Sequence, residues 1–354
     1  MCHFAESGEV LKISEAIKRV NKRALIAVAV CVSLIVGIII FDYSVKKSEY
    51  QTTTVAMGTI INLRLFGPDG EENAGYVIEN IRETETALLS RNEENSDVDR
   101  INDAPGTAVS VSTETTAVIT KALEIAEKSG GVFDITVGEI TKLWDFGGEN
   151  QRVPTETEIA EKLTYVNHSS VKVTSTSVTI ADGQSIDLGA VGKGAACDRV
   201  KNLLSQTNTD SAVISVGGSL LLYGNRTFNI GIANPENSAE AMGTLSLSDT
   251  FVSTSGDYER FFTEGSTTYH HILDATTGYP ADSRLTSVTV ICDSGVLSDA
   301  LSTVCYLLGY NESLAILQEY DAQAVFTFKD KTVRLTDGIK DNFTLTDESF
   351  VVAE

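Results

Sequence analysis

Cysteine and basic residues are scarce in this chain of 354 residues. Its five cysteines form no C-x-x-C pair, so neither a disulfide framework nor a zinc site is indicated. Cys197, Cys292 and Cys305 are expected to be small buried hydrophobic residues. Lys and Arg number 27 against 49 Asp and Glu, which gives a net charge of −22. This acidity argues against a nucleic-acid partner and favours attraction of Mg²⁺ or Ca²⁺.

Several common sequence patterns are also missing. The glycine-rich segments match neither the Walker pattern nor G-x-G-x-x-G, and no G-x-S-x-G elbow is present. Helical and strand patterns alternate irregularly, without a βαβ period of about thirty residues. With 42% hydrophobic and 21% charged residues, the chain is expected to fold as an α+β protein with mainly antiparallel sheets.

One apolar run stands near the N-terminus. Ala24 to Phe41 contains no charge, and eighteen helical residues at about 1.5 Å each span about 27 Å, close to a bilayer core. Lys and Arg precede the run, so we expect residues 1–23 in the cytoplasm, a transmembrane anchor at 24–42, a linker at 43–53 and an extracytoplasmic domain at 54–354. A cleaved signal peptide is the alternative, but Phe41-Asp42-Tyr43 is a poor cleavage site. A lipoprotein cysteine at Cys31 is discounted, because it lies inside the apolar run.

The domain after the linker shows clear local patterns. Alternation predicts a strand at 59–66, and helical spacing predicts helices at 75–89 and 113–128. A capping box at Thr155–Glu158 predicts a short helix to about Leu163. Further strands are predicted at 171–173, 178–180, 212–216, 228–232, 243–247 and 285–291.

The segment from Tyr269 to Pro280 (YHHILDATTGYP) carries two of the four histidines of the chain. His270 and His271 stand at the end of an apolar step, before an Asp and a Thr-Gly turn, which is typical of a strand that delivers a titratable group to a loop. Two surface histidines at a strand end are the simpler alternative.

A helix is predicted from Ser294 to Gly309, with a Ser cap and a terminal glycine. Asp299 and Thr303 lie one turn apart, on the side opposite the apolar face, and two hard oxygens so placed can hold Mg²⁺. An Asp and a Thr at this spacing on a solvated helix face are common, so the pattern alone is weak.

Glycine-rich turns mark two further candidate sites. Ser185 to Gly194 (SIDLGAVGKG) predicts a strand, a turn and the start of a helix, where free N–H groups and Lys193 could bind an anion. The only tryptophan, Trp144, lies between FDITVG at 133–138 and the turn of LWDFGG at 143–148, and is either buried core or the wall of a pocket for a flat ligand. A serine nucleophile within 252–260 is a weak alternative.

Taken in order, these segments resemble the ApbE family, the FAD:protein FMN transferases. The likeness covers about residues 54–345. Its motifs are Met57-Gly58-Thr59, FDITVG at 133, LWDFGG at 143, IDLGAVGKG at 186, ISVGGS at 214, STSGDYERFF at 253, HHILDATTGYP at 270 and SDALST at 298. The resemblance implies a T-fold-like α+β domain that transfers FMN from FAD to a Thr or Ser of membrane redox proteins and releases AMP.

The resemblance also implies roles for single residues. Mg²⁺ would be held by Asp299, Thr303 and the carbonyl of Ala190. FAD would contact Met57, Asp134, Asp187, Lys193 and the main chain near Ile272. His271 would be the base that deprotonates the acceptor hydroxyl, a task that suits an imidazole with an ordinary pKa near 6.5. His270 has no matched role.

Three residues depart from the family pattern, namely Ala195, Ser219 and Ala275, where the family commonly has Tyr, Asn and Pro. None is an implied metal ligand or base, so the implied reaction is retained. Two alternatives stay open: an FAD pyrophosphatase that uses water as acceptor, and a non-catalytic extracytoplasmic flavin-binding protein. The simultaneous presence of Lys193, His271, Asp299 and Thr303 favours an enzyme.

Overall fold

A computed structural model describes Ser33 and residues 49–353. The predicted cytoplasmic segment and transmembrane anchor therefore lie outside the described residues, apart from Ser33. Within the part that is described, no helix has both the length and the apolar character needed to cross a membrane. The folded unit begins at Tyr50. Residues 49–53, which we expected to be linker, belong to a strand that runs from Glu49 to Ala56.

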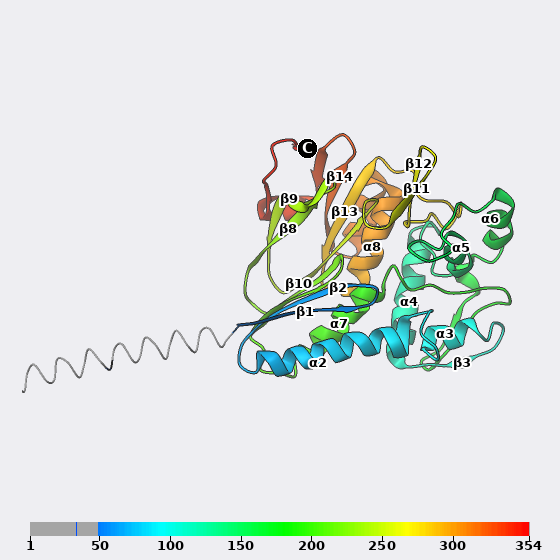
Figure 1. The fold of residues 1–354 in the computed structure, drawn as a ribbon, viewed down its shortest axis with the longest axis horizontal. Coiled ribbons are helices and arrows are strands. Elements are labelled where there is room, and N and C mark those ends of the chain that lie inside the picture. Colours follow the sequence, from blue (N-terminus) through cyan, green and yellow to red (C-terminus); the bar gives the residue numbers. More distant parts are fainter. Residues whose placement is uncertain (1–32, 34–48, 354) are drawn as a thin grey trace, which may run out of the picture. The chain divides into compact units, whose positions relative to one another are not determined.

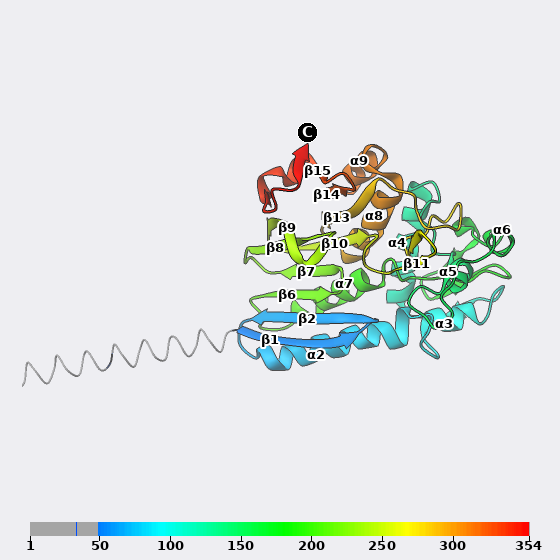
Figure 2. The same ribbon diagram turned by 45° about the horizontal axis from the view of Figure 1, so that its top comes forward.

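A nine-stranded sheet forms the centre of this unit (Figures 1 and 2). Its strands, in spatial order, are β1 (Glu49–Ala56), β2 (Thr59–Phe66), β6 (Ser211–Val216), β7 (Ser219–Tyr223), β10 (Thr250–Gly256), β13 (Leu285–Cys292), β14 (Gln323–Phe328), β15 (Thr332–Leu335) and β17 (Val351–Ala353). The pairings from β2 to β15 are antiparallel, and β17 adds in parallel to β15. The predicted α+β class with mainly antiparallel sheets is confirmed.

Three small sheets accompany the large one. They are β16 (Phe343–Leu345) with β9 (Asn237–Leu247) and β8 (Phe228–Asn234), β3 (Val109–Ser110) with β5 (Ser177–Thr179) and β4 (Lys172–Val173), and β11 (Phe261–Glu264) with β12 (Thr267–His270). The hairpin predicted at 171–180 is the β4–β5 pair.

The helices of the described residues begin and end close to their sequence signals. They are α2 (Gly70–Glu83), a π-helical turn (Thr84–Leu89), α3 (Asp97–Asn102), α4 (Thr113–Lys128), α5 (Gly138–Trp144), α6 (Glu156–Leu163), α7 (Gly192–Leu204), α8 (Gly295–Leu308) and α9 (Tyr310–Glu319), with 3₁₀ turns at His168–Ser170 and Asp337–Asn342. The capping box of α6 is present in full. The helix expected from Gly75 instead starts at Gly70 and passes into the π-helical turn.

The apolar side chains form separate layers on the two faces of the large sheet. On one face α2 and α7 pack on β2, β6 and β7, and α8 packs on β10 and β13 with α4 against it. On the other face, residues such as Leu222, Val252 and Val325 contact Phe228 and Leu245 of the β8–β9 pair. Burial of this size is the main stabilising contribution. All three described cysteines are buried and free, as predicted.

Candidate active site

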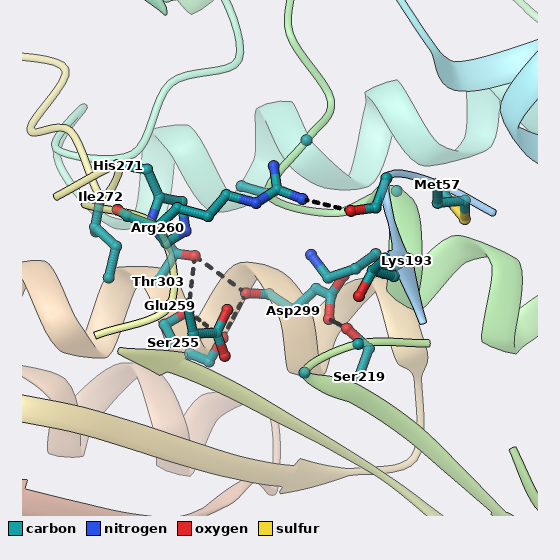
Figure 3. A pocket seen from close by; sticks show the side chains of 18 of the residues that line it. Met57, Lys193, Ser219, Ser255, Glu259, Arg260, His271, Ile272, Asp299 and Thr303 are labelled. Atoms are coloured by element: carbon teal, nitrogen blue, oxygen red, sulfur yellow. Dashed lines mark hydrogen bonds between the residues drawn. The ribbon is translucent and has the colours of Figure 1, made fainter. Parts of the chain in front are cut away.

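The sequence motifs converge on a cavity of about 1300 Å³. Its wall includes the turn between β1 and β2, the start of α7, the turn before β7, the end of β10, the segment after β12 and one side of α8. Met57, Asp134, Asp187, Ala190, Lys193, His271, Ile272, Asp299 and Thr303 all line it. The structure thus brings every candidate site residue to a single cavity, although the motifs span about 250 positions of the chain (Figure 3).

Asp299 lies at the base of the cavity. The side chain of Ser294 caps α8 by accepting from the N–H of Leu297, and one turn of helix then places Asp299 beside the start of α7. Its carboxylate accepts from the N–H of Gly194 at 2.7 Å, from the Ser253 hydroxyl at 2.6 Å and from the Ser219 hydroxyl. Asp299 is only 4% exposed. The simpler alternative of a solvated helix face is therefore wrong for Asp299, because the side opposite the apolar stripe faces a cavity.

The close approach of α7 and α8 depends on two glycines. A Cβ atom on Gly194 would lie 2.0 Å from the carbonyl oxygen of Gly295, a distance at which the helices would have to separate. Asp198 of α7 adds to this junction by accepting from the N–H groups of Gly295 and Val296, both at 2.9 Å. Burial raises the pKa of Asp198, although these hydrogen bonds oppose the shift.

The residues around Asp299 have the chemistry of a magnesium site. A buried carboxylate, the Thr303 hydroxyl and the Ala190 carbonyl are hard oxygens on one cavity wall, and Mg²⁺ commonly binds through one carboxylate completed by substrate phosphates and water. Among the ion pairs of residues 49–353 none includes Asp299, so its buried negative charge has no protein cation bound to it. Its three hydrogen bonds leave one of about four acceptor positions for a cation. The donor set fits the ion.

Two cations and a second carboxylate face the same space. Lys193 projects from the first turn of α7 toward the cavity, and the Arg260 side chain extends across it, where it donates to the Gly58 carbonyl at 3.4 Å (Figure 3). Glu259, the residue directly before Arg260 in the chain, lines the same cavity. Burial raises the pKa of Glu259, whereas the charges of Lys193 and Arg260 oppose that shift. Sequence analysis gave Glu259 and Arg260 no role, because the motif STSGDYERFF did not show which side chains face inward.

Asp187 is held by several neighbours. Its carboxylate accepts from the Thr141 hydroxyl at 2.9 Å and the N–H of Gly189 at 2.7 Å, and it pairs with Arg91 at 3.2 Å. Arg91 also lines the cavity, and the sequence offered no motif that singled it out. The Gly-rich turn is thus tied to α5 on one side and to the segment after the π-helical turn on the other.

His271 lines the cavity as an uncharged imidazole at neutral pH. The main-chain N–H of His271 donates to the Arg260 carbonyl at 3.0 Å. The ring Nδ1 of His271 lies 3.3 Å from the same oxygen. Burial, together with the charges of Lys193 and Arg260, lowers the pKa of His271 to about 4. At neutral pH the ring is therefore uncharged and able to take a proton.

His270 points the other way, into the protein. It is 7% exposed, its Nδ1 accepts from the N–H of Ile272 at 3.3 Å, and its Nε2–H donates to the Ala281 carbonyl at 3.0 Å. Burial lowers its pKa. The Ile272 carbonyl in turn accepts from the N–H of Ala281. The main-chain groups of Ile272 are thus used within the protein, and its side chain is the part that lies in the cavity wall.

Met57 and Asp134 occupy the remaining walls. Met57 has a positive φ of 52°, and its N–H donates to the Glu85 carboxylate at 2.7 Å. Asp134 is buried, where its carboxylate accepts from Thr136 and from the backbone and ring of His168. The implied FAD contact of Asp134 stays a prediction, because these bonds already give its carboxylate a structural role.

Trp144 is core and does not line the cavity. It is fully buried, its Nε1–H donates to the Gly278 carbonyl at 2.8 Å, and it stacks on Phe146 at a centroid distance of 5.5 Å. Phe146 is the aromatic residue of this motif that reaches the cavity. The first of the two alternatives for Trp144 is confirmed.

A cavity lined by three cationic side chains (Arg91, Lys193 and Arg260), a buried carboxylate and a neutral imidazole defines a class of protein that binds a phosphate-bearing ligand and can move a proton beside it. Comparison with known proteins gives the family. The model of the ApbE family matches residues 57–326. The chain therefore belongs to the ApbE family, as its motifs predicted.

Individual relatives agree with this assignment. The chain is 31% identical over 351 residues to the FAD:protein FMN transferase of Treponema pallidum (strain Nichols), which covers 92% of this chain and 97% of the relative. It is 33% identical over 311 residues to an FAD:protein FMN transferase of Klebsiella pneumoniae (strain 342), covering 86% and 97%. The crystal structure of the ApbE protein of Thermotoga maritima aligns with a TM-score of 0.77 at 30% identity, covering 83% of this chain and 99% of that chain.

Proposed function

We propose that this protein is an FAD:protein FMN transferase that attaches FMN through a phosphoester to a Thr or Ser of target redox proteins. One observation carries the proposal. The buried carboxylate of Asp299, which has no cation partner among residues 49–353, and the neutral imidazole of His271 line the same cavity. The family relatives support the proposal. Two of them are FAD:protein FMN transferases, and this chain matches each over 97% of its length.

The reaction exchanges one P–O bond for another. The acceptor oxygen forms a bond to the FMN-side phosphorus of FAD, the bond to the bridging oxygen breaks, and its electron pair leaves with AMP. The acceptor proton passes to a ring nitrogen of His271, which the pKa of about 4 keeps unprotonated at neutral pH. Lys193 and Arg260 supply positive charge where negative charge spreads over the phosphoryl oxygens.

Mg²⁺ belongs to this proposal through the oxygen donors at the cavity base. Asp299, Thr303 and the Ala190 carbonyl would hold the ion, which when bound neutralises charge on the diphosphate. The serines that donate to Asp299 fix the direction of its carboxylate. Ser219, which departs from the family pattern, is one of these donors.

The test of this proposal is the Asp299→Asn variant with FAD, Mg²⁺ and a peptide that carries a Thr in the acceptor motif of the family. We expect transfer to fall on the order of 100-fold or more, because several kcal/mol of charge stabilisation is lost. Asp337→Asn is the matched control, because its carboxylate is 96% exposed and lies outside the cavity. Fluorescence of the peptide adduct and release of AMP are measured together.

The products separate the competing activities. An adduct with AMP in equal amounts supports the transferase. AMP and free FMN at the same rate with and without peptide would identify a pyrophosphatase, and tight FAD binding without AMP would identify a binding protein. An undiminished rate in Asp299→Asn would overturn the metal assignment.

We also propose that the catalytic domain is anchored to the cell membrane by one helix at residues 24–42 and works on the outer side. The support is the uncharged run from Ala24 to Phe41 and the basic residues before it. The expected targets are then membrane electron-transfer proteins with an accessible Thr or Ser.

A further inference from the structure

Strand β8 (Phe228–Asn234) ends one of the small sheets. The order of that sheet is β16-β9-β8, and β8 pairs with β9 along its whole length. Among residues 49–353, no backbone hydrogen bond joins β8 to any strand other than β9. Alternate N–H and C=O groups of β8 therefore have no strand to pair with on the other side.

This free edge borders the candidate active site. Ile230, Gly231, Ile232 and Ala233 are consecutive, and all four line the cavity that also contains His271 and Asp299. Side chains of a strand alternate between its two faces, so a face turned to a cavity would contribute only every second residue. The register of β8 on β9 shifts between Ile232 and Ala233, so alternation is broken there, but Ile230, Gly231 and Ile232 are consecutive in regular register. These three lining residues indicate that the edge, with its backbone groups, adjoins the cavity.

The part of the cavity next to β8 is apolar. Leu245 of β9 and Leu220 and Val252 of the large sheet line it, together with Ile230 and Ile232. In contrast, the charged residues of the site come from α7, α8 and the segments around β11 and β12. An occupant of the β8 side therefore needs backbone groups for the edge and apolar side chains at alternate positions.

A polypeptide in extended conformation has both properties. We propose that the acceptor segment of the target protein binds as an added antiparallel or parallel strand on the free edge of β8, with apolar side chains against Leu220 and Ile230, which are only partly buried. The inference rests on the proposed transferase function, which requires that a polypeptide enter the cavity that holds FAD. Backbone pairing supplies affinity, and the apolar contacts supply sequence preference.

The test uses a peptide with a Thr in the family's acceptor motif and two N-methylated versions of it. One carries N-methyl groups at alternate residues, and the other carries them at the intervening residues. Only every second N–H of an added strand faces β8, so one version should lose several hydrogen bonds, with a KM raised by at least about tenfold, while the other keeps a KM close to that of the parent peptide.

Protein variants provide a second measurement. Ile230→Asp should raise the KM for the peptide and leave the KM for FAD unchanged, whereas Asn229→Asp, next to it on the strand and outside the cavity, should change neither. Equal transfer to both methylated peptides would overturn the added strand while leaving the transferase in place. A higher KM for FAD in Ile230→Asp would assign the apolar side to the flavin and also overturn it. Absence of adduct with the parent peptide would overturn the proposed function itself.

Discussion

Two adjacent histidines show how the position of a single residue decides its role. His270 is the last residue of β12, and its ring closes hydrogen bonds to Ile272 and Ala281 within the protein. The next side chain alternates to the opposite direction, so His271 faces the cavity. The buried His270 holds the loop in place, and His271, the proposed base, lies on the side of that loop that faces the cavity.

The pKa of His271 leads to a prediction of pH dependence. A folded pKa of about 4, below the ordinary 6.5, means that the base form predominates above pH 4. We expect kcat/KM for FAD to rise between about pH 3 and 5 and to stay level to neutrality, because kcat/KM reports the free enzyme.

Arg260→Gln tests the cause of that shift. Loss of the guanidinium charge removes one contribution that lowers the pKa, so the acid limb of the profile should move toward higher pH. A profile that already turns near pH 6.5 in the unchanged enzyme would contradict the assignment.

The lowered pKa of His271 also affects stability. As the pH falls from about 6.5 to 4, the unfolded chain binds the proton of His271 before the folded chain does. The free energy of unfolding therefore decreases over this range.

At the scale of elements, the contact between α7 and α8 determines the site. Each helix contributes a glycine at the crossing, and the contact places the N–H of Gly194 against the Asp299 carboxylate. Asp198 fixes the N-terminus of α8 from the other helix. The carboxylate of Asp299, a proposed metal ligand, is thus held by α7, the helix that also carries Lys193.

Gly194→Ala should therefore reduce both stability and activity. The added methyl group would meet a carbonyl oxygen at 2.0 Å, and we expect the free energy of unfolding in urea to fall by about 2 kcal/mol or more. Gly75→Ala is the matched control, because Gly75 lies in α2 with open space around it. That change should raise the free energy of unfolding by roughly 0.5–1 kcal/mol. Equal effects of the two variants would show that the helix crossing tolerates separation.

At the scale of the whole molecule, the proposed anchor separates two environments. The full chain should remain in the membrane fraction after washing with high salt, whereas a chain without residues 24–41 should appear in the soluble fraction. A protease that reaches only the outer side of the cell membrane should cleave the catalytic domain of the anchored chain. Recovery of the full chain in the soluble fraction would show that the apolar run does not insert, and recovery of a shortened chain there would show that the run is removed.

Much of the local structure follows from the sequence, because its signals are local. The alternation in 59–66 gave β2, and Thr155 with Glu158 gave the start of α6. β1 was missed because its polar run Gln51-Thr52-Thr53-Thr54 is typical of a linker, and its pairing with β2 makes it a strand. The motifs also predicted which residues would share a site.

By itself the sequence determined the family, the α+β class and the residue types of the site, since these depend on periodicity and on motifs of a few residues. The tertiary structure alone decided what surrounds each group. Asp299 takes its donors from positions 46, 80 and 105 residues away, and the cavity next to His271 is bordered by the free edge of β8. Such contacts depend on the register of distant strands and the crossing of helices, which no local pattern encodes.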